Sequence, residues 1–434
     1  MILTIIGGSA HSTPVLIEAL ARLHPRIRLT VRLVGRDKAR LHSVERACNL
    51  LAAGTVIEAV SYRDEQLNEA LTGADIVLIQ ARISGYAGRA FDESFSLPYG
   101  IPGDEGLGPG GLSAAYRSWP QIRALLQRTK SIAPQALVIL LSSPGSLLIR
   151  LAALTWPGWP VIGTCELPLT TLDHLCALTG ADAAQVQFTY TGVNHLGFLC
   201  DVRTGAATVV TERELMATDN LLGRYIAQQQ KEVFPSSALV AQLGGFPLKY
   251  LRLHFEPEQV AREQTDRTVS RADELVALSQ RAFEVYRAGD AEAIRHVLSS
   301  RRVDWYEFAI IPLLLTKMGL PVSRPMFLTI ALGNEELRER AYTSRDGAFV
   351  ALPPSGLTPP ALEALVTAFS EYEQAAARAV IDGSTEALTY ALSLHPSFSD
   401  RDVRALAEAI VNQPFSRHDG ACATPNENEE LCLI

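Results

Sequence analysis

The chain has 434 residues, of which 47% are hydrophobic and 20% are charged, and its formal net charge at pH 7 is −8. This length exceeds what one hydrophobic core usually serves, so we expect two domains or one large composite fold. The acidic balance and the scattered Lys and Arg residues argue against a surface for nucleic acids or anionic membranes. Apolar stretches are too short to span a bilayer, and the six Cys residues are too irregularly spaced for a disulfide framework. The expected location is therefore the reducing cytoplasm.

The start of the chain reads as a strand, a glycine-rich turn and a helix. An apolar run at residues 1–6 leads into Gly7, Gly8 and Ser9, and a helical pattern follows Thr13. This is the context in which the pyrophosphate of a dinucleotide binds at a helix N-terminus. The fingerprint G-x-G-x-x-G would have glycine where Ser9 stands, so the motif is weak. Glycines of a tight turn that binds no ligand are the alternative.

The second strand, expected at residues 27–34, ends in an unusual way for an NAD-binding unit. Such units place Asp or Glu at this point to bind the ribose hydroxyls, but here Gly35 and Arg36 follow. Arg36 fits the 2′-phosphate of NADP as well as it fits a solvated turn, so both interpretations stay open. Further elements follow, with a helix at residues 38–53 and strands at residues 55–60 and 74–80. Alternating strands and helices of these lengths predict a parallel sheet with right-handed crossovers.

Residues 82–120 break this rhythm with a segment rich in glycine, proline and charge. The segment follows a strand, and ligands of open α/β sheets bind at the carboxyl ends of strands. We therefore expect a long functional loop there. Its side chains, among them Arg89 and Glu105, could bind sugar hydroxyls, phosphate or the groups around a metal. A solvated charged loop is the alternative.

Two apolar strands in the middle of the chain end in polar residues. One strand leads to Cys165 and Glu166. The next, at residues 185–192, leads to Asn194 and His195. A thiolate and an imidazole suit a divalent transition metal, and a carboxylate beside Cys165 could move a proton. On these residues alone, a buried Cys and His with only packing roles are the more common outcome.

The later part of the chain reads as largely helical. The dinucleotide-binding domain is expected to cover residues 1–192, and a second α/β domain, for the substrate and for oligomerisation, residues 193–412. Residues 413–434 are polar and are expected to be disordered. Helices of the second domain are expected at residues 212–231, 270–287, 359–382, 388–394 and 400–411.

Six segments occur in one order along the chain: IIGGSAHSTP, GYAGRAFDES, PYGIPGDEGLGPGGL, VIGTCELPL, TGVNHLGF and FPLKYLR. Together they resemble glycoside hydrolase family 4, the NAD- and metal-dependent 6-phosphoglycosidases and their relatives. The resemblance covers residues 1–260 well and is looser over residues 300–412. It implies a Rossmann-type parallel-sheet domain followed by a mixed α/β domain, as in lactate and malate dehydrogenases. It also implies NAD, with NADP as the alternative, and Mn²⁺ or another divalent metal.

The chemistry that the resemblance implies differs from that of glycosidases with two carboxylates. The nicotinamide oxidises the sugar hydroxyl at C3, which acidifies the hydrogen at C2. A tyrosine takes that proton, the glycosidic bond breaks by elimination, and water addition and return of the hydride follow. The metal polarises the oxygens at C2 and C3. The expected reaction is the hydrolysis of a 6-phospho-glucoside, similar to that of a 6-phospho-β-glucosidase.

The resemblance also implies roles for individual residues. Cys165 and His195 match the metal ligands. Tyr250 matches the tyrosine base, and Glu166 stands where relatives carry a general acid. The implied substrate contacts are Arg89, Glu105, Ser143 and Asn194, and the implied cofactor contacts are Gly7, Gly8, Ser9, Thr13 and Arg36.

The chain departs from the family pattern at Ser9, Gly35, Asp104 and Ser143. Two other functions stay open. A 2-hydroxy-acid dehydrogenase would share the fold but use no metal, so the Cys165 and His195 pair disfavours it. A non-catalytic protein that binds sugar or dinucleotide is supported only by the departures at Ser9, Gly35 and Ser143. Relatives of the fold imply a homo-dimer or homo-tetramer.

Overall fold

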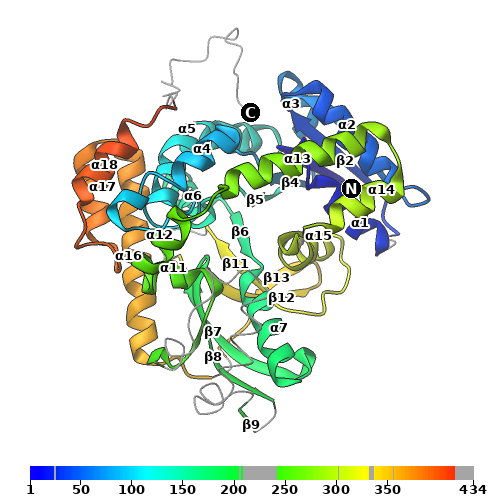
Figure 1. Ribbon diagram of the computed structural model, residues 1–434. Coiled ribbons are helices and arrows are strands. Elements are labelled where there is room, and N and C mark those ends of the chain that lie inside the picture. The colour runs from blue at the N-terminus through cyan, green and yellow to red at the C-terminus, as the bar shows by residue number, and fades with distance from the viewer. Residues whose placement is uncertain are drawn as a thin grey trace.

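The structure is a computed structural model that describes residues 1–23, 26–204, 207–208, 242–301, 303–331, 337–354 and 356–415. Figure 1 shows a broad twisted sheet with helices on both faces and a smaller sheet, carrying β7 and β8, at one end of the molecule. None of the helices in these ranges is long and apolar enough to cross a bilayer. The helix expected at residues 212–231, and all but the first residues of the tail expected at 413–434, lie outside the described residues.

Within the described ranges, one sheet has nine strands, of which the first six in sequence run parallel. Their order is β3-β2-β1-β4-β5-β6, the order of dinucleotide-binding doubly wound folds, so the predicted Rossmann sheet is confirmed. The four residues of β4 are all buried apolar residues, as expected for a parallel strand covered on both faces. The bounds are β1 (Ile2–Ile6), β2 (Leu29–Gly35), β3 (Ile57–Arg63), β4 (Ile76–Ile79), β5 (Leu137–Leu140) and β6 (Val161–Cys165).

Three antiparallel strands extend this sheet beyond β6: β11 (Met326–Ile330), β12 (Arg340–Arg345) and β13 (Ala348–Ala351). In the pairing of β11 with β6, Phe327 lies opposite Cys165. These strands are not predicted from the sequence, because short apolar runs fit a helix and a strand equally well. The sheet thus continues across the expected domain boundary at residue 192, and the boundary itself stays a prediction.

Alternate residues of the strands point to opposite sides of the sheet, so both faces are apolar. Helices cover both of these faces. Ile5 of β1 belongs to the core on one face, and its neighbour Ile6 belongs to the core on the other. The first face packs against α1 (Thr13–Arg22), α2 (Lys38–Leu51), α13 (Arg271–Ala288), α14 (Ala291–Ser299), the π-helical segment η6 (Tyr306–Ile310) and α15 (Ile311–Lys317). The second face packs against α3 (Leu67–Leu71), α5 (Gly108–Ile132), α6 (Gly145–Thr155), α16 (Pro360–Asp382), α17 (Thr385–Ser393) and α18 (Val403–Val411).

The segment at residues 82–120 is largely helical, so the predicted long loop is wrong. It contains α4 (Gly85–Asp92), the 3-10 helix η2 (Leu97–Tyr99) and the start of α5. Pro109 lies in the first turn of α5, where a helix tolerates proline. Gly110 allows close packing rather than irregularity, because a Cβ there would lie 2.2 Å from the carbonyl oxygen of Asp104.

The second sheet has a hairpin at its centre, in which β7 (Val186–Val193) pairs with β8 (Leu196–Thr204). Asn194 and His195 form the two-residue turn between these strands. The remaining elements of this region are α7 (Leu167–Thr179), η3 (Ala183–Gln185), β9 (Ala207–Thr208), β10 (Phe246–Pro247), η5 (Lys249–Leu251), α11 (Arg252–Phe255) and α12 (Pro257–Thr265). The short helix η1 (Asp64–Gln66) follows β3.

Candidate active site

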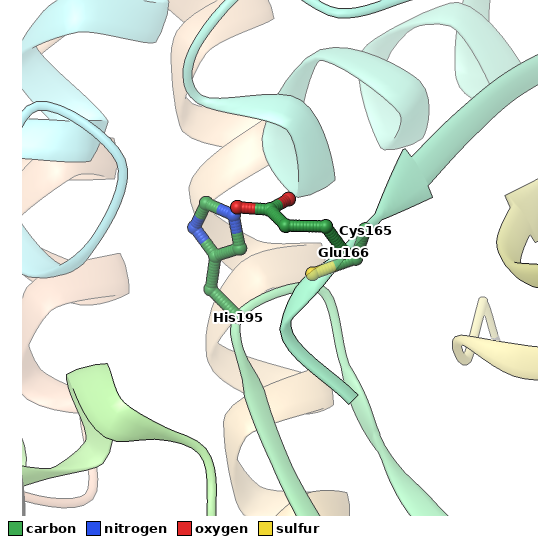
Figure 2. Close-up of side chains that lie close together, drawn as sticks. All are labelled: Cys165, Glu166 and His195. Atoms are coloured by element: carbon green, nitrogen blue, oxygen red, sulfur yellow. The ribbon is translucent and has the colours of Figure 1, made fainter. Parts of the chain in front are cut away.

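Three potential metal ligands meet at the carboxyl end of β6. Cys165 is the last residue of β6, Glu166 precedes α7, and His195 lies in the turn between β7 and β8. Their ligand atoms, which are Sγ, a carboxylate oxygen and a ring nitrogen, all lie within 4.8 Å of one another. Figure 2 shows the three side chains converging from the strand end and the hairpin turn. The structure thus brings together Cys165 and His195, which the sequence predicts as a pair.

The environment of these groups favours their neutral forms. Burial raises the pKa of the Cys165 thiol well above its usual value and raises the pKa of Glu166, and it lowers the pKa of His195 to about 4. The backbone N–H groups of Leu167 and His195 act in the opposite direction on Cys165, because they donate hydrogen bonds to its sulfur. A divalent cation would stabilise a thiolate and a neutral imidazole together. The sulfur of Cys165 and the ring nitrogen of His195 therefore fit a transition metal, with Glu166 beside them.

A buried carboxylate holds the turn that carries His195. The backbone of His195 is left-handed, with a φ of +67°, which is uncommon outside glycine. Glu339, 2% exposed, accepts hydrogen bonds from Asn194 Nδ2 at 3.1 Å and from the hydroxyl of Tyr190 at 2.5 Å. The backbone N–H of Glu339 also donates to the carbonyl of Gly192 at 3.0 Å. The amide nitrogen of Asn194, a predicted substrate ligand, is therefore bonded within the protein.

Tyr250 lies beside the cluster. Its ring centroid is 5.4 Å from that of His195, and the Nζ of Lys249 is 5.2 Å from the Tyr250 centroid. Burial raises the pKa of the Tyr250 hydroxyl above its usual value, nearby carboxylates add to the shift, and two arginines oppose it. The phenol can therefore act as a base only if positive charge stabilises the phenolate.

Arg89 and Glu105 are brought together in an ion-pair network. Arg89 donates to Glu105 at 2.7 Å and to Glu93 at 2.7 Å, and Arg82 also donates to Glu105. The side chains of Arg89 and Glu105 are both 15% exposed. Much of their hydrogen-bonding capacity is used within the protein, so their contacts with a sugar stay a prediction.

Ser143 and His195 face a common space beside Gly106. A Cβ placed on Gly106 would lie 3.4 Å from Ser143 Oγ and 3.6 Å from His195 Nδ1. The N–H of Gly106 donates to Asp104 Oδ1 at 2.7 Å, and burial raises the pKa of Asp104 to about 7. The missing side chain of Gly106 thus leaves room next to the imidazole.

Two cationic side chains near Tyr250 are not among the site residues predicted from the sequence. Among the described residues, Lys249 and Arg301 have no carboxylate partner within ion-pair distance. Burial, together with the charges of Arg271 and Arg89, lowers the pKa of Arg301 to about 10. Lys249 lies in the segment FPLKYLR, which resembles the family, so its place near the site could have been predicted. Arg301 and Glu339 come from segments farther along the chain that match no such motif.

The glycine-rich turn has the backbone of a dinucleotide site. Gly7 has a φ of +85°, its N–H donates to the carbonyl of Val34 at 3.0 Å, and a Cβ there would lie 2.8 Å from the backbone of Ala81. Thr13 is the first residue of α1, and its hydroxyl accepts from Gln80 at 3.0 Å. The turn lies between β1 and α1, where the strand order of the sheet reverses, so it fits a bound dinucleotide. The predicted contacts Gly7, Gly8, Ser9 and Thr13 lie here, and Arg36 is exposed just after β2.

Comparison with known proteins shows which enzymes this chain is similar to. The family model described as "Family 4 glycosyl hydrolase" matches residues 2–180. This N-terminal part of the chain is therefore similar to family 4 of the glycosyl hydrolases. The 6-phospho-alpha-glucosidase 1 of Lacticaseibacillus paracasei is 26% identical over 287 residues, which cover 63% of this chain and 64% of that protein. The chain thus matches less than two thirds of the length of this relative.

Two other comparisons extend over nearly the whole chain. A protein of Bacillus subtilis named "Probable 6-phospho-beta-glucosidase" is 22% identical over 455 aligned residues, covering 96% of each chain. The 6-phospho-beta glucosidase of Thermotoga maritima, solved with manganese, NAD⁺ and glucose-6-phosphate, has a TM-score of 0.78 at 21% identity. The superposition covers 95% of this chain and 97% of that one, which confirms the predicted fold.

The family 4 match covers only part of the candidate site. Gly7, Arg89 and Cys165 lie within residues 2–180, whereas His195 and Tyr250 lie beyond them. The structure, rather than the family match, therefore places the imidazole and the phenol beside Cys165.

Proposed function

We propose that the chain hydrolyses the glycosidic bond of a phosphorylated glucoside, assisted by a nicotinamide dinucleotide and a divalent metal. The observation that carries this proposal is the convergence of Cys165, Glu166 and His195 beside Tyr250, at the carboxyl edge of a Rossmann sheet. The names of the relatives, which include 6-phospho-alpha- and 6-phospho-beta-glucosidases, support it. A metal site of this kind has no role in a 2-hydroxy-acid dehydrogenase.

When bound, the nicotinamide would supply reversible oxidation at the C3 of the sugar, and the ion would polarise the neighbouring oxygens. Cys165 and His195 would hold the ion. Tyr250 accepts the proton at C2, since its ring lies against His195. The ammonium of Lys249, 5.2 Å from the centroid of the Tyr250 ring, favours the phenolate. Glu166 gives a proton to the oxygen of the leaving group.

We assign recognition of the phosphate to Arg301. Arg301 lies close enough to Arg271 and Arg89 for their charges to depress its pKa, so a dianion there would relieve repulsion. Arg301→Met should raise KM for a 6-phospho-glycoside about 10- to 100-fold, as expected for a lost charged hydrogen bond. KM for the unphosphorylated glycoside should be nearly unchanged, and an equal rise for both substrates would contradict the assignment.

A panel of nitrophenyl glycosides tests the function. The α- and β-glucosides, each with and without a 6-phosphate, are incubated with a reductant and with NAD⁺ or NADP⁺, Mn²⁺, both or neither. We expect nitrophenol release that needs the dinucleotide and the metal together, from a phosphorylated substrate. In D₂O the product should carry deuterium at C2, because the C2 proton leaves and returns. Hydrolysis without the dinucleotide, or product without deuterium, would refute the proposal.

We also propose that the chain forms a homo-dimer or homo-tetramer. Large side chains are exposed at Ile381 of α16, at Tyr390 of the adjoining α17 and at Leu394 just after α17, with exposed fractions of 50%, 64% and 38%. Such side chains often lie in subunit interfaces. Light scattering coupled to gel filtration would measure the mass, and a monomer at micromolar concentration would contradict the proposal.

A further inference from the structure

Two residues that depart from the usual dinucleotide-binding pattern, Ser9 and Gly35, lie in contact in the structure. Ser9 follows β1 and Gly35 ends the adjacent parallel strand β2. A Cβ built on Gly35 would lie 2.9 Å from Ser9 Oγ and 3.1 Å from Ser9 Cβ. The hydroxymethyl group of Ser9 therefore lies against the position where a side chain of residue 35 would begin. An acidic residue at position 35 would require the side chain of Ser9 to move.

The neighbouring acidic residue cannot replace the missing carboxylate. Asp37 caps α2, because its Oδ1 accepts the N–H groups of Ala39 and Arg40 at 3.0 Å each. Its Oδ2 lies 3.4 Å from the guanidinium of Arg40. The residue opposite Gly35 on β3 is Arg63, which is also basic. This corner of the sheet thus lacks the carboxylate that usually binds the two ribose hydroxyls of NAD.

The same corner carries polar and positive groups that are not engaged. Arg36 and Lys38 are exposed and, within the described part of the chain, have no carboxylate within ion-pair distance. Ser9 Oγ, also without a hydrogen-bond partner among the described residues, adds a hydroxyl donor beside Gly35. A phosphate group offers several acceptor oxygens and nearly two negative charges, which match a guanidinium and a hydroxyl.

We propose that Ser9, Gly35 and Arg36 form a specificity device that selects a nicotinamide dinucleotide with a phosphate on the 2′-oxygen of its adenosine ribose. Ser9 and Gly35 exclude the carboxylate that would repel this phosphate, and Arg36 neutralises it. This inference rests on the proposed function, which requires a nicotinamide dinucleotide. It departs from the Thermotoga maritima relative, whose structure contains NAD⁺.

Calorimetric titration tests the device without any catalysis. Adenosine 2′,5′-bisphosphate and 5′-AMP isolate the ribose corner, and NADP⁺ and NAD⁺ test the whole cofactor. We expect the phosphorylated member of each pair to bind about 10- to 100-fold more tightly, as one charge-assisted contact allows. Arg36→Met should remove most of this preference. Arg28→Met is the matched control. It removes the same charge from the residue just before β2, whereas Arg36 lies just after β2.

A double replacement tests the role of Ser9 and Gly35. Gly35→Asp alone should weaken the binding of both dinucleotides, because the new side chain collides with Ser9. Combined with Ser9→Gly, it should restore binding and reverse the preference toward NAD⁺. Thermal melting of each variant without ligand confirms that it folds.

Three outcomes decide the inference. A reversed preference in the double variant would support it. Equal or tighter binding of NAD⁺ to the wild-type chain, with metal-dependent hydrolysis intact, would overturn this inference but leave the proposed function standing. Failure of both dinucleotides to bind would overturn this inference together with the cofactor part of the proposed function.

Discussion

Cys165 is a fully buried thiol with a carboxylate and an imidazole beside it, at the end of a central strand. We predict that Cys165→Ser weakens Mn²⁺ binding by more than the ~10–100-fold typical of residues that only support ligands. A serine hydroxyl keeps the size of the side chain but ionises far less readily than a thiol. Cys176→Ser is the matched control, since Cys176 is a buried cysteine of α7 outside the cluster. Equal Mn²⁺ affinity in the two variants, measured by titration, would remove Cys165 from the metal site.

Tyr250 tests the proton-transfer step. We predict that Tyr250→Phe lowers turnover by ~10²–10⁴-fold, the range for loss of a general base. The ring is kept, so metal and dinucleotide affinities should hardly change. Tyr190→Phe serves for comparison, because Tyr190 donates to Glu339 and its loss should act on stability rather than on proton transfer. If Tyr250→Phe kept wild-type turnover and C2 deuteration, another residue would have to be the base.

At the scale of elements, the β7–β8 hairpin depends on a segment far along the chain. Glu339 lies just before β12, yet it binds Tyr190 of β7 and Asn194 of the turn. Sequence patterns carry little information about such a contact, because the partners are brought together only when the second sheet packs beside the first.

We predict that Glu339→Ala destabilises the protein by about 1–3 kcal/mol for each buried donor that loses its acceptor. It should also weaken metal binding, since the turn that carries His195 loses its support. Glu339→Gln keeps one acceptor oxygen and should cost less on both measures. Urea denaturation gives the free energy of unfolding, and Mn²⁺ titration gives the affinity. A stable Glu339→Ala protein with full metal affinity would show that the turn holds its shape unaided.

At the scale of the whole molecule, two buried histidines join α11 to the C-terminal helices. The ring of His254 lies 5.2 Å from that of His395 and 5.3 Å from that of Phe369 on α16. Within the described ranges of the chain, neither ring nitrogen of His254 has a hydrogen-bond partner. Burial lowers the pKa of His254 to about 3, so this side chain is neutral in the folded protein over the physiological pH range.

The pH dependence of stability follows from this shift. The folded pKa of His254 lies below its unfolded value of 6.5, so the unfolded chain takes up the proton first. The contribution to stability is complete above about pH 6.5 and is lost as the pH falls toward 3, by about 2–3 kcal/mol between pH 6.5 and 4.5. We predict a shallower acid dependence of the unfolding free energy in His254→Phe than in the wild type. Equal slopes for His254→Phe and the wild type would contradict the prediction.

The sequence by itself determined the elements whose signals are local. In the strands and helices, apolar residues recur at the period of the element itself, so these elements could be predicted without knowing what packs against them. The glycine-rich turn could be predicted from its neighbouring glycines in the same way. The pairing of Cys165 with His195 was also predictable, because both residues follow apolar strands and match motifs of one family.

Only the tertiary structure decided which residues support and surround this pair. The glycines and prolines of residues 82–120 suggested a loop, but Gly110 serves close packing of a helix against the backbone of Asp104. Arg301 and Glu339 reach the site from distant segments, and the contact of Ser9 with Gly35 joins two separate strands. The physical reason is that steric exclusion, burial and charge repulsion depend on distances in space, which local sequence patterns do not specify.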